Sequence, residues 1–198
     1  MVEKVKRAPG RPRAFDVDQA LGKAMRLFWA QGYDGTSLDD LEAAMEIGRP
    51  SMYRAFGDKR TLFMKCLAHY SDNVAGASVR LLDAHVEIRQ AMVAFYGQAV
   101  GNVCEDGIGC MVGCVATSVA DPEVKDFLRV SSAVVEAALE ARFRKAVEEG
   151  QLRADFPVAC RARRGFDALI ALGFRGRSGA DRETLLHDAQ ETAELILS

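Results

Sequence analysis

The chain has 198 residues, of which 49% are apolar, and a formal net charge of −2, which allows one large domain or two small ones with a real core. No run reaches the roughly 18 uncharged apolar residues of a membrane span, and no apolar stretch follows the basic N-terminus, so neither a membrane protein nor a signal peptide is expected. Five cysteines at uneven spacing argue against a secreted disulfide framework. We therefore expect a reduced, cytoplasmic protein.

The charge is unevenly distributed along the chain. Residues 1–64 contain 11 Lys and Arg against 9 Asp and Glu, a net of +2, whereas residues 65–198 have a net of −4. A protein that binds nucleic acid needs its positive charge on the face that meets the phosphates. The N-terminal part of the chain is therefore the candidate for such a face.

Residues 1–14 are basic, contain two prolines and have almost no apolar content, so we expect a flexible arm there. Within the arm, Gly10-Arg11-Pro12-Arg13 resembles the core of an AT-hook, an extended segment whose arginines lie in a narrow A·T minor groove. In that interpretation Arg11 and Arg13 read the minor groove. In the alternative, the arm is a basic tail with only non-specific affinity, and four residues do not decide between the two.

The first predicted helix begins after Asp16, a good N-cap, and its apolar residues recur at helical spacing until Gly32 ends it. A second short helix is capped by Ser37 or by Thr36, each with an aspartate three residues later. These signals predict two of the three helices of a small N-terminal head.

The third predicted helix, from about residue 49 to 56, opens with small, polar and basic residues. Pro50 is tolerated there because the first N–H groups of a helix have no partner within it. Arg49 could form a bidentate contact with guanine, and Ser51 could bond a base edge or a phosphate. Two short helices joined by a tight turn, with this start to the second, are typical of a helix-turn-helix that reads the major groove.

Asp58 is the expected N-cap of a long fourth helix, from about residue 59 to 84. Helical periodicity then continues without strand-like alternation, and the predicted segments are 86–104, 108–120, 122–149, 157–174 and 181–197. The predicted fold class is all-α, with a three-helix head joined by the long helix to a helical body. The predicted domains are the arm at 1–14, a DNA-binding head at 15–60 and a body for effector sensing and dimerisation at 61–198.

The stretch from Gly35 to Lys59, G-T-S-L-D-D-L-E-A-A-M-E-I-G-R-P-S-M-Y-R-A-F-G-D-K, resembles, nearly residue for residue, the DNA-reading element of the TetR family of transcriptional repressors. The resemblance covers residues 10–70 tightly and the remainder loosely. It implies that Tyr53 contacts phosphate and that Lys59 lies against the DNA backbone. In the alternative, Tyr53 is a core aromatic residue and Lys59 belongs to a solvated helix start.

Thr36 and Ser37 join this set because a helix N-terminus favours a phosphate. The predicted DNA-binding residues are Arg11, Arg13, Thr36, Ser37, Arg49, Pro50, Ser51, Tyr53, Arg54 and Lys59.

The turn departs from the family pattern at two positions. Glu46 stands where a glycine is usual, at a position that often needs positive φ, which costs a non-glycine residue about 1 kcal/mol. Gly48 stands where a serine or similar residue usually caps the recognition helix, and it is a weaker cap. These departures bear on the geometry of the turn and not on the motif.

A single recognition helix buries too little surface for useful specificity, so helix-turn-helix repressors usually bind as dimers. The resemblance implies that the last two helices, at about 157–174 and 181–197, pair with their copies in a four-helix bundle. Phe174 and Leu195 are among the apolar residues that these helices offer. The predicted dimerisation residues are Phe166, Leu169, Ile170, Gly173, Leu185, Leu186 and Ala189.

The segment from Gly109 to Val124 resembles the Gly-Cys-hydrophobic helix in one branch of TetR sensor domains, where a ligand cavity forms beside the fourth helix. The resemblance implies a small-molecule inducer. Each lining residue could equally be ordinary core. The predicted pocket residues are Phe63, Cys66, Leu67, Tyr70, Val93, Phe95, Tyr96, Cys110, Met111 and Cys114.

Cys110 and Cys114 are four residues apart and would share a helical face with Cβ atoms about 5–6 Å apart, too far for a disulfide without unwinding. Some relatives in this branch sense electrophiles or oxidants through such thiols, whereas a buried cysteine is also an ordinary small hydrophobe. The cysteine and histidine spacing matches no common metal site, so neither a metal nor a cofactor is expected.

The function expected is that of a homodimeric, one-component repressor without enzymatic activity, released from a palindromic DNA operator by a ligand or by thiol modification. The sequence does not distinguish repression from activation. One rival is a thiol-based redox or electrophile-processing protein with a DNA-localising head, although no Cys-x-x-Cys, nucleophile elbow or phosphate loop appears. A second rival is an architectural DNA binder that has no inducer.

Overall fold

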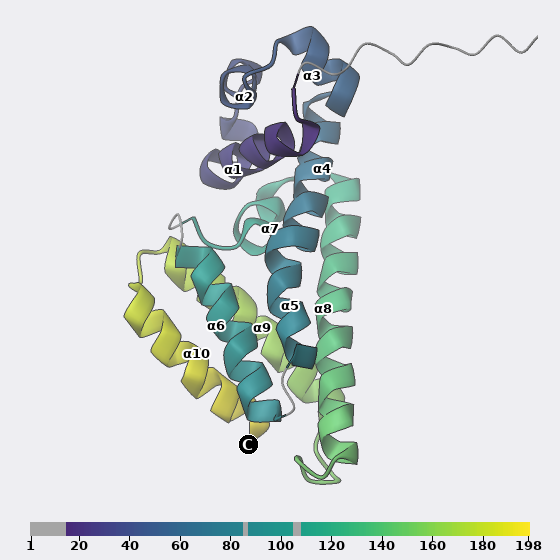
Figure 1. Cartoon of the computed structure of the whole chain (residues 1–198), viewed down its shortest axis with the longest axis vertical. Coiled ribbons are helices and arrows are strands. Elements are labelled where there is room, and N and C mark those ends of the chain that lie inside the picture. The colour runs from purple at the N-terminus through teal and green to yellow at the C-terminus, as the bar shows by residue number, and fades with distance from the viewer. Residues whose placement is uncertain (1–14, 85–86, 105–107) are drawn as a thin grey trace, which may run out of the picture.

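The computed structural model describes residues 15–84, 87–104 and 108–198. Within these ranges every regular element is helical, which confirms the predicted all-α class. A small head lies at one end of an elongated helical body (Figure 1). The arm at residues 1–14, with Arg11 and Arg13, lies outside the described residues.

The head is formed by α1 (Val17–Gly35), α2 (Leu38–Met45) and α3 (Arg49–Phe56), and α4 (Lys59–Tyr70) leads from it into the body. Local capping explains where several of these helices begin. The Asp16 carboxylate accepts the N–H groups of Asp18 and Gln19, and Ser37 forms a capping box with Asp40. Gly32 breaks the helix where expected, with φ 79° and ψ 170°, and a short second helical piece continues α1 beyond this kink as far as Gly35.

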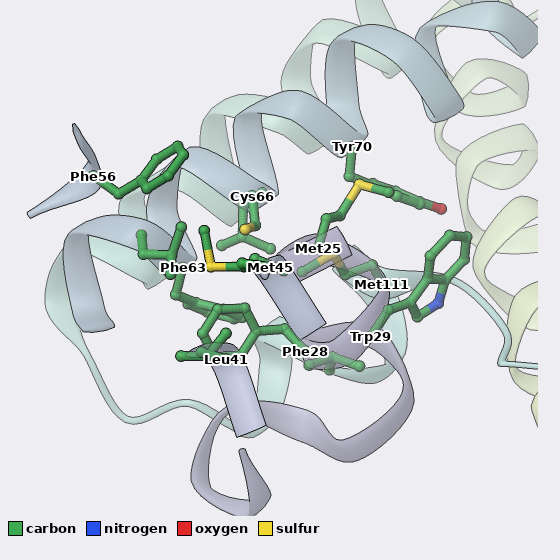
Figure 2. Packing of buried hydrophobic residues seen from close by; sticks show 14 of the residues in the cluster. Met25, Phe28, Trp29, Leu41, Met45, Phe56, Phe63, Cys66, Tyr70 and Met111 are labelled. Carbon is green, nitrogen blue, oxygen red and sulfur yellow. The ribbon is translucent and has the colours of Figure 1, made fainter. Parts of the chain in front are cut away.

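The core of the head continues into the body. Phe28, Leu41, Phe56 and Phe63, one from each of the four helices, are all buried, with the Phe28 and Phe63 rings meeting edge to face at 5.1 Å (Figure 2). The same cluster includes residues from beyond the head, namely Met111, Val115, Ala116, Val119 and Val124. Head and body therefore share one hydrophobic core at their junction.

The predicted fourth helix keeps its course but changes its hydrogen bonding midway. After α4, residues Ser71–Ala75 form a π-helical turn, which is followed by α5 (Gly76–Ala84). We call α4, this turn and α5 together the rod. A π-helical turn widens the backbone locally and is often found at functional sites. In this protein it lies beside a cavity of about 500 Å³.

The body is formed by α6 (Ile88–Cys104), α8 (Pro122–Glu148), α9 (Val158–Arg177) and α10 (Arg182–Leu197). In Figure 1, α8 runs beside α4 and α5, while α6 and α10 lie together on the opposite side and α9 passes behind them. The helix predicted at 108–120 is wrong in extent. Only α7 (Met111–Cys114) and a 3-10 turn at Ala116–Ser118 form in the described part, because glycines weaken helix formation in this segment.

None of the helices in the described ranges is both long and apolar enough to cross a membrane.

Glu46 adopts the left-handed conformation anticipated for the turn, with φ 57° and ψ 35°. Its carboxylate lies 2.7 Å from the Lys23 ammonium, but the pair is largely exposed and contributes little. We expect Glu46→Gly to raise the free energy of unfolding by about 1 kcal/mol, because glycine removes the conformational strain. Chemical denaturation measures the change. Glu46→Ala is the matched control, since it removes the ion pair and keeps the strain, and equal stability of the two variants would contradict the prediction.

Candidate nucleic-acid interface and cavity

Helix α3 presents one face to the core and the other to solvent. Met52 and Phe56 are buried, whereas Tyr53 and Arg54 are exposed and Ser51 is half-buried. The Tyr53 side chain is 44% exposed, so the interpretation of Tyr53 as a core residue is wrong. The exposed side of this short helix therefore offers a hydroxyl, a phenol and a guanidinium within about one helical turn.

Arg49 is engaged within the head. Its guanidinium Nε donates to the Glu42 carboxylate at 2.6 Å, and its other end forms an ion pair with Asp39. Hydrogen bonds to Glu42 and then Asp39 raise the pKa of Arg49 further above its usual value. Glu42 also accepts the Arg49 backbone N–H at 2.5 Å. Because Gly48 has no side chain to cap α3, Glu42 of the preceding helix supplies the missing cap.

Arg54 and Lys59 differ in how their charges are held. Arg54 has no ion pair or hydrogen bond from its side chain to the described residues and is exposed. Lys59 lies over the Tyr33 ring with its ammonium 4.5 Å from the ring centre, an arrangement that holds a cation near the start of α4. Lys59 is thus positioned by a neighbour and is not simply a solvated helix start.

The two candidate residues at the start of α2 have different environments. Ser37 is exposed at the N-cap, where hydrogen bonds from Ser37 lower the pKa of Asp40. Thr36 is fully buried, and its hydroxyl donates to the Gly32 carbonyl at 2.7 Å. The Thr36 side chain therefore serves the end of α1, and only the Ser37 side of this turn faces solvent. Pro50 is exposed in the first turn of α3.

Arg60 connects the head to the body. Its guanidinium Nε donates to the Asp121 carboxylate at 2.6 Å and a second nitrogen reaches Glu123. The bond from Arg60 lowers the pKa of Asp121, the N-cap of α8, to about 2. This contact has no local signal in the sequence, because its two partners are 61 residues apart.

A cavity of about 500 Å³ lies in the body between the π-helical turn with α5, α8 and α9. Its wall is mostly apolar, and such a concave, apolar space is typical of a small-molecule site. The exposed side chains of Asp72 and Arg80 lie at its edge. The apolar wall residues that α8 and α9 contribute are Phe127, Val130, Val134, Val135, Phe166, Leu169 and Ile170.

The predicted pocket residues are dispersed in the structure. Tyr70 and Cys110 line the cavity, and together with Phe95 they also line a smaller cavity of about 50 Å³ next to it. Phe63 lines a separate hollow at the junction of head and body. The remaining residues pack in the two cores or, for Cys114, beside Gly109: Cys66, Leu67, Val93, Tyr96, Met111 and Cys114.

Most of the residues predicted for dimerisation pack within the single chain or line its cavity. Leu185, Leu186 and Ala189 pack in the body core, and Gly173 lies against Cys110. Phe166, Leu169 and Ile170 line the cavity. Outward-facing apolar surface on these helices comes instead from Phe174 and Leu195, which are 65% and 67% exposed.

The surroundings of Cys110 favour the protonated form of its thiol. All five cysteines are free, and burial raises the pKa of Cys110 above its ordinary value. Its sulfur lies 3.5 Å from the Tyr70 hydroxyl and accepts the Gly113 N–H at 3.3 Å. Because the thiolate is the reactive form of cysteine, the folded environment slows the reaction of Cys110 with electrophiles at neutral pH.

The geometry defines a helix-turn-helix DNA-binding protein whose body contains a ligand-sized cavity. The family described as bacterial regulatory proteins, tetR family, matches residues 20–66. The transcriptional repressor ComR of Escherichia coli K12 is 30% identical over 200 residues, which is 96% of this chain and 93% of ComR.

Two solved structures extend the comparison over the whole fold. A cysteine mutant of the TetR family regulator CifR, bound to a 26-base-pair double-stranded operator, is 33% identical with a TM-score of 0.84, covering 93% of this chain and 98% of that chain. A TetR regulator from Rhodococcus sp. RHA1 is 33% identical with a TM-score of 0.62, covering 90% of this chain and 97% of that chain. The chain belongs to the TetR family and is a helix-turn-helix transcriptional repressor.

Proposed function

We propose that this protein is a homodimeric, non-enzymatic cytoplasmic repressor that leaves operator DNA when a small molecule occupies the cavity of about 500 Å³. One observation carries the proposal. The rod formed by α4, the π-helical turn and α5 begins at Lys59, next to the recognition helix, and its middle forms part of the cavity wall. A ligand that favours one arrangement of this rod would change the position of the head, and only a difference in affinity between the two arrangements can release DNA.

The DNA-facing set supported by exposure is Ser37, Pro50, Ser51, Tyr53, Arg54 and Lys59. We assign Arg54 the main charged contact, because its guanidinium has no partner among the described residues. We assign Arg49 the role of fixing α2 against α3, because Asp39 and Glu42 already bind its charge. In a dimer the two recognition helices would enter successive major grooves of a palindromic operator. The structure of the relative CifR in complex with a double-stranded operator supports the binding of operator DNA.

A non-covalent apolar ligand fits the cavity better than thiol modification does. The wall is largely hydrophobic, and the raised pKa of Cys110 keeps that thiol protonated at neutral pH. Thiol modification at Cys110, which lines the cavity at the N-cap of α7, is the second route. A Cys110→Ser variant separates the routes, because it retains the response to an apolar ligand and loses any response to an electrophile.

The proposed dimer interface is the outer face of α9 and α10, where Phe174 and Leu195 are exposed. Large apolar side chains at the centre of an interface carry much of the binding energy. We expect Phe174→Glu to raise the dimer dissociation constant at least about tenfold, measured by sedimentation equilibrium. Val134→Glu is the control, because Val134 of α8 is 59% exposed but lies outside the proposed face. An equal loss in both variants would place the interface elsewhere.

The deciding experiment selects a duplex from a random DNA library with the purified full-length protein, then measures binding by fluorescence anisotropy against a scrambled duplex across a salt series. Selective binding with a palindromic consensus, and release by apolar compounds that bind the protein, is the expected result. Equal and steeply salt-dependent binding to both duplexes would overturn the proposal, because non-specific affinity comes from phosphate contacts alone. Selective binding that no small molecule alters would favour the architectural alternative.

A further inference from the structure

The smaller cavity, of about 50 Å³, continues the larger one toward the interior. The two cavities share six lining residues, so these side chains lie between the two spaces: Tyr70, Ala75, Val79, Cys110, Val135 and Leu169. Helices α5 and α6 close its inner end. The space can hold a group of one or two heavy atoms, comparable to a single water.

Ser78 of α5 lies in the wall of this inner cavity, and its hydroxyl forms no hydrogen bond with the described residues. The side chain is 3% exposed. Leaving a buried hydroxyl without a partner is unfavourable, and such groups in folded proteins usually reflect a requirement other than stability.

Of the other polar side chains around the two cavities, Tyr70 donates its hydroxyl hydrogen to the Cys110 sulfur, and Ser71 and Ser131 are half-buried. Asn102, in the inner wall, donates to the Val74 carbonyl at 3.1 Å and accepts from Gln98 at 3.0 Å. Ser132, in the outer wall, donates to the Leu128 carbonyl at 2.8 Å. Asp72 and Arg80 are exposed at the edge. Ser78 therefore supplies the buried hydrogen-bonding capacity that a ligand would meet at the inner end.

We infer that the cavity binds an apolar molecule with one terminal hydrogen-bonding group, a hydroxyl or a carbonyl, and that Ser78 orients this molecule by bonding that group. The inference rests on the proposed ligand-binding function of the same cavity. The apolar part of the ligand occupies the space between α5, α8 and α9, and the polar end displaces the side chains that separate the inner cavity. Ser78 thus determines specificity by rejecting molecules that leave its hydroxyl unpaired.

The test uses 1-octanol and 1-chlorooctane, two probes of the same chain length of which only the alcohol hydrogen-bonds well. Trp29, the single tryptophan of the chain, reports binding because its ring meets the Tyr70 ring edge to face at 4.9 Å. We expect Ser78→Ala to raise the dissociation constant of 1-octanol about fivefold relative to that of 1-chlorooctane, which is the effect of one hydrogen bond. Ser118→Ala is the control and should keep the wild-type ratio, because the Ser118 hydroxyl donates to the Val115 carbonyl at 2.7 Å and the residue lines neither cavity.

Stability of the unliganded protein gives a second, independent readout. Because the Ser78 hydroxyl is unpaired, Ser78→Ala should leave the unfolding equilibrium constant unchanged or lower it by about fivefold. A fivefold rise in the unfolding equilibrium constant would show that the Ser78 hydroxyl has a hydrogen-bond partner in the folded protein, and it would overturn the inference. If the ratio of the 1-octanol and 1-chlorooctane dissociation constants is unchanged in Ser78→Ala, the inference is overturned too, while the proposed function stays intact. If neither probe changes Trp29 fluorescence, the inference and the apolar-ligand part of the proposed function both fail, and selective operator binding alone remains.

Discussion

Replacing Arg54 with alanine is expected to lower the affinity for a selected operator about 10- to 100-fold, the loss typical of one direct arginine contact to a base. Arg54 is exposed on α3, and no described side chain neutralises its charge. Fluorescence anisotropy on specific and scrambled duplexes measures the change. A loss confined to the specific duplex identifies a base contact, whereas a uniform loss with a salt slope reduced by about one identifies a phosphate contact.

Arg49→Ala is the matched comparison in the same helix. Since Glu42 and Asp39 bind the Arg49 guanidinium, its removal should loosen α2 against α3 and lower the melting temperature of the head more than it lowers base discrimination. Glu42→Gln should reproduce part of this effect because it weakens the same cluster. If Arg49→Ala instead abolishes specific binding without altering thermal unfolding, Arg49 leaves its partners on DNA, and the assignment of the two arginines is reversed.

Gly176→Ala is expected to destabilise the body by about 2 kcal/mol and to lower the melting temperature by about 4–8 °C. A Cβ at Gly176 of α9 would lie 2.0 Å from a methyl carbon of Val103 in α6, and 3.4 Å from Leu185 of α10. The three helices meet here only because this residue has no side chain. Circular dichroism during heating measures the loss.

Two further variants make the Gly176 prediction specific. In a Val103→Ala background, which removes the clashing methyl group, Gly176→Ala should cost less than about 0.5 kcal/mol, and the resulting double-mutant cycle measures the coupling. Gly97→Ala in α6 is the control, since nothing lies within 4 Å of the added Cβ, and it should stabilise the helix by up to about 1 kcal/mol. Destabilisation by Gly97→Ala as large as by Gly176→Ala would contradict the close-contact explanation.

The head was largely predictable because its signals are local. The capping box of Ser37 and Asp40, the start of α3 at Arg49 and the left-handed conformation at Glu46 all depend on neighbours within a few residues. The segment after residue 107 was less predictable. Its apolar residues fit a helix by periodicity, but its glycines weaken the helix and it packs closely against α9, as at Gly173, where an added Cβ would lie 2.8 Å from the Cys110 Cβ.

The cavity could not be assembled from periodicity alone. Apolar residues at helical spacing on α9 show which side is buried, but not whether that side meets another chain or a cavity, as Phe166 and Ile170 demonstrate. Charge pairing was equally hidden. The sequence identifies Arg49 as a cation at the start of a helix, but only the packing of α2 against α3 brings Asp39 and Glu42 to it.

The shared core at the junction has a consequence for protein engineering. Met111, Val115 and Val124 pack with the head helices, although they lie far beyond residue 60 in the chain. In a chimera that joins residues 1–60 to the body of another regulator, the body-facing surface of the transplanted head would lack its own packing partners. A functional exchange of operator specificity in this scaffold therefore has to transplant the surface of α3 residue by residue, or carry residues 108–124 along with the head.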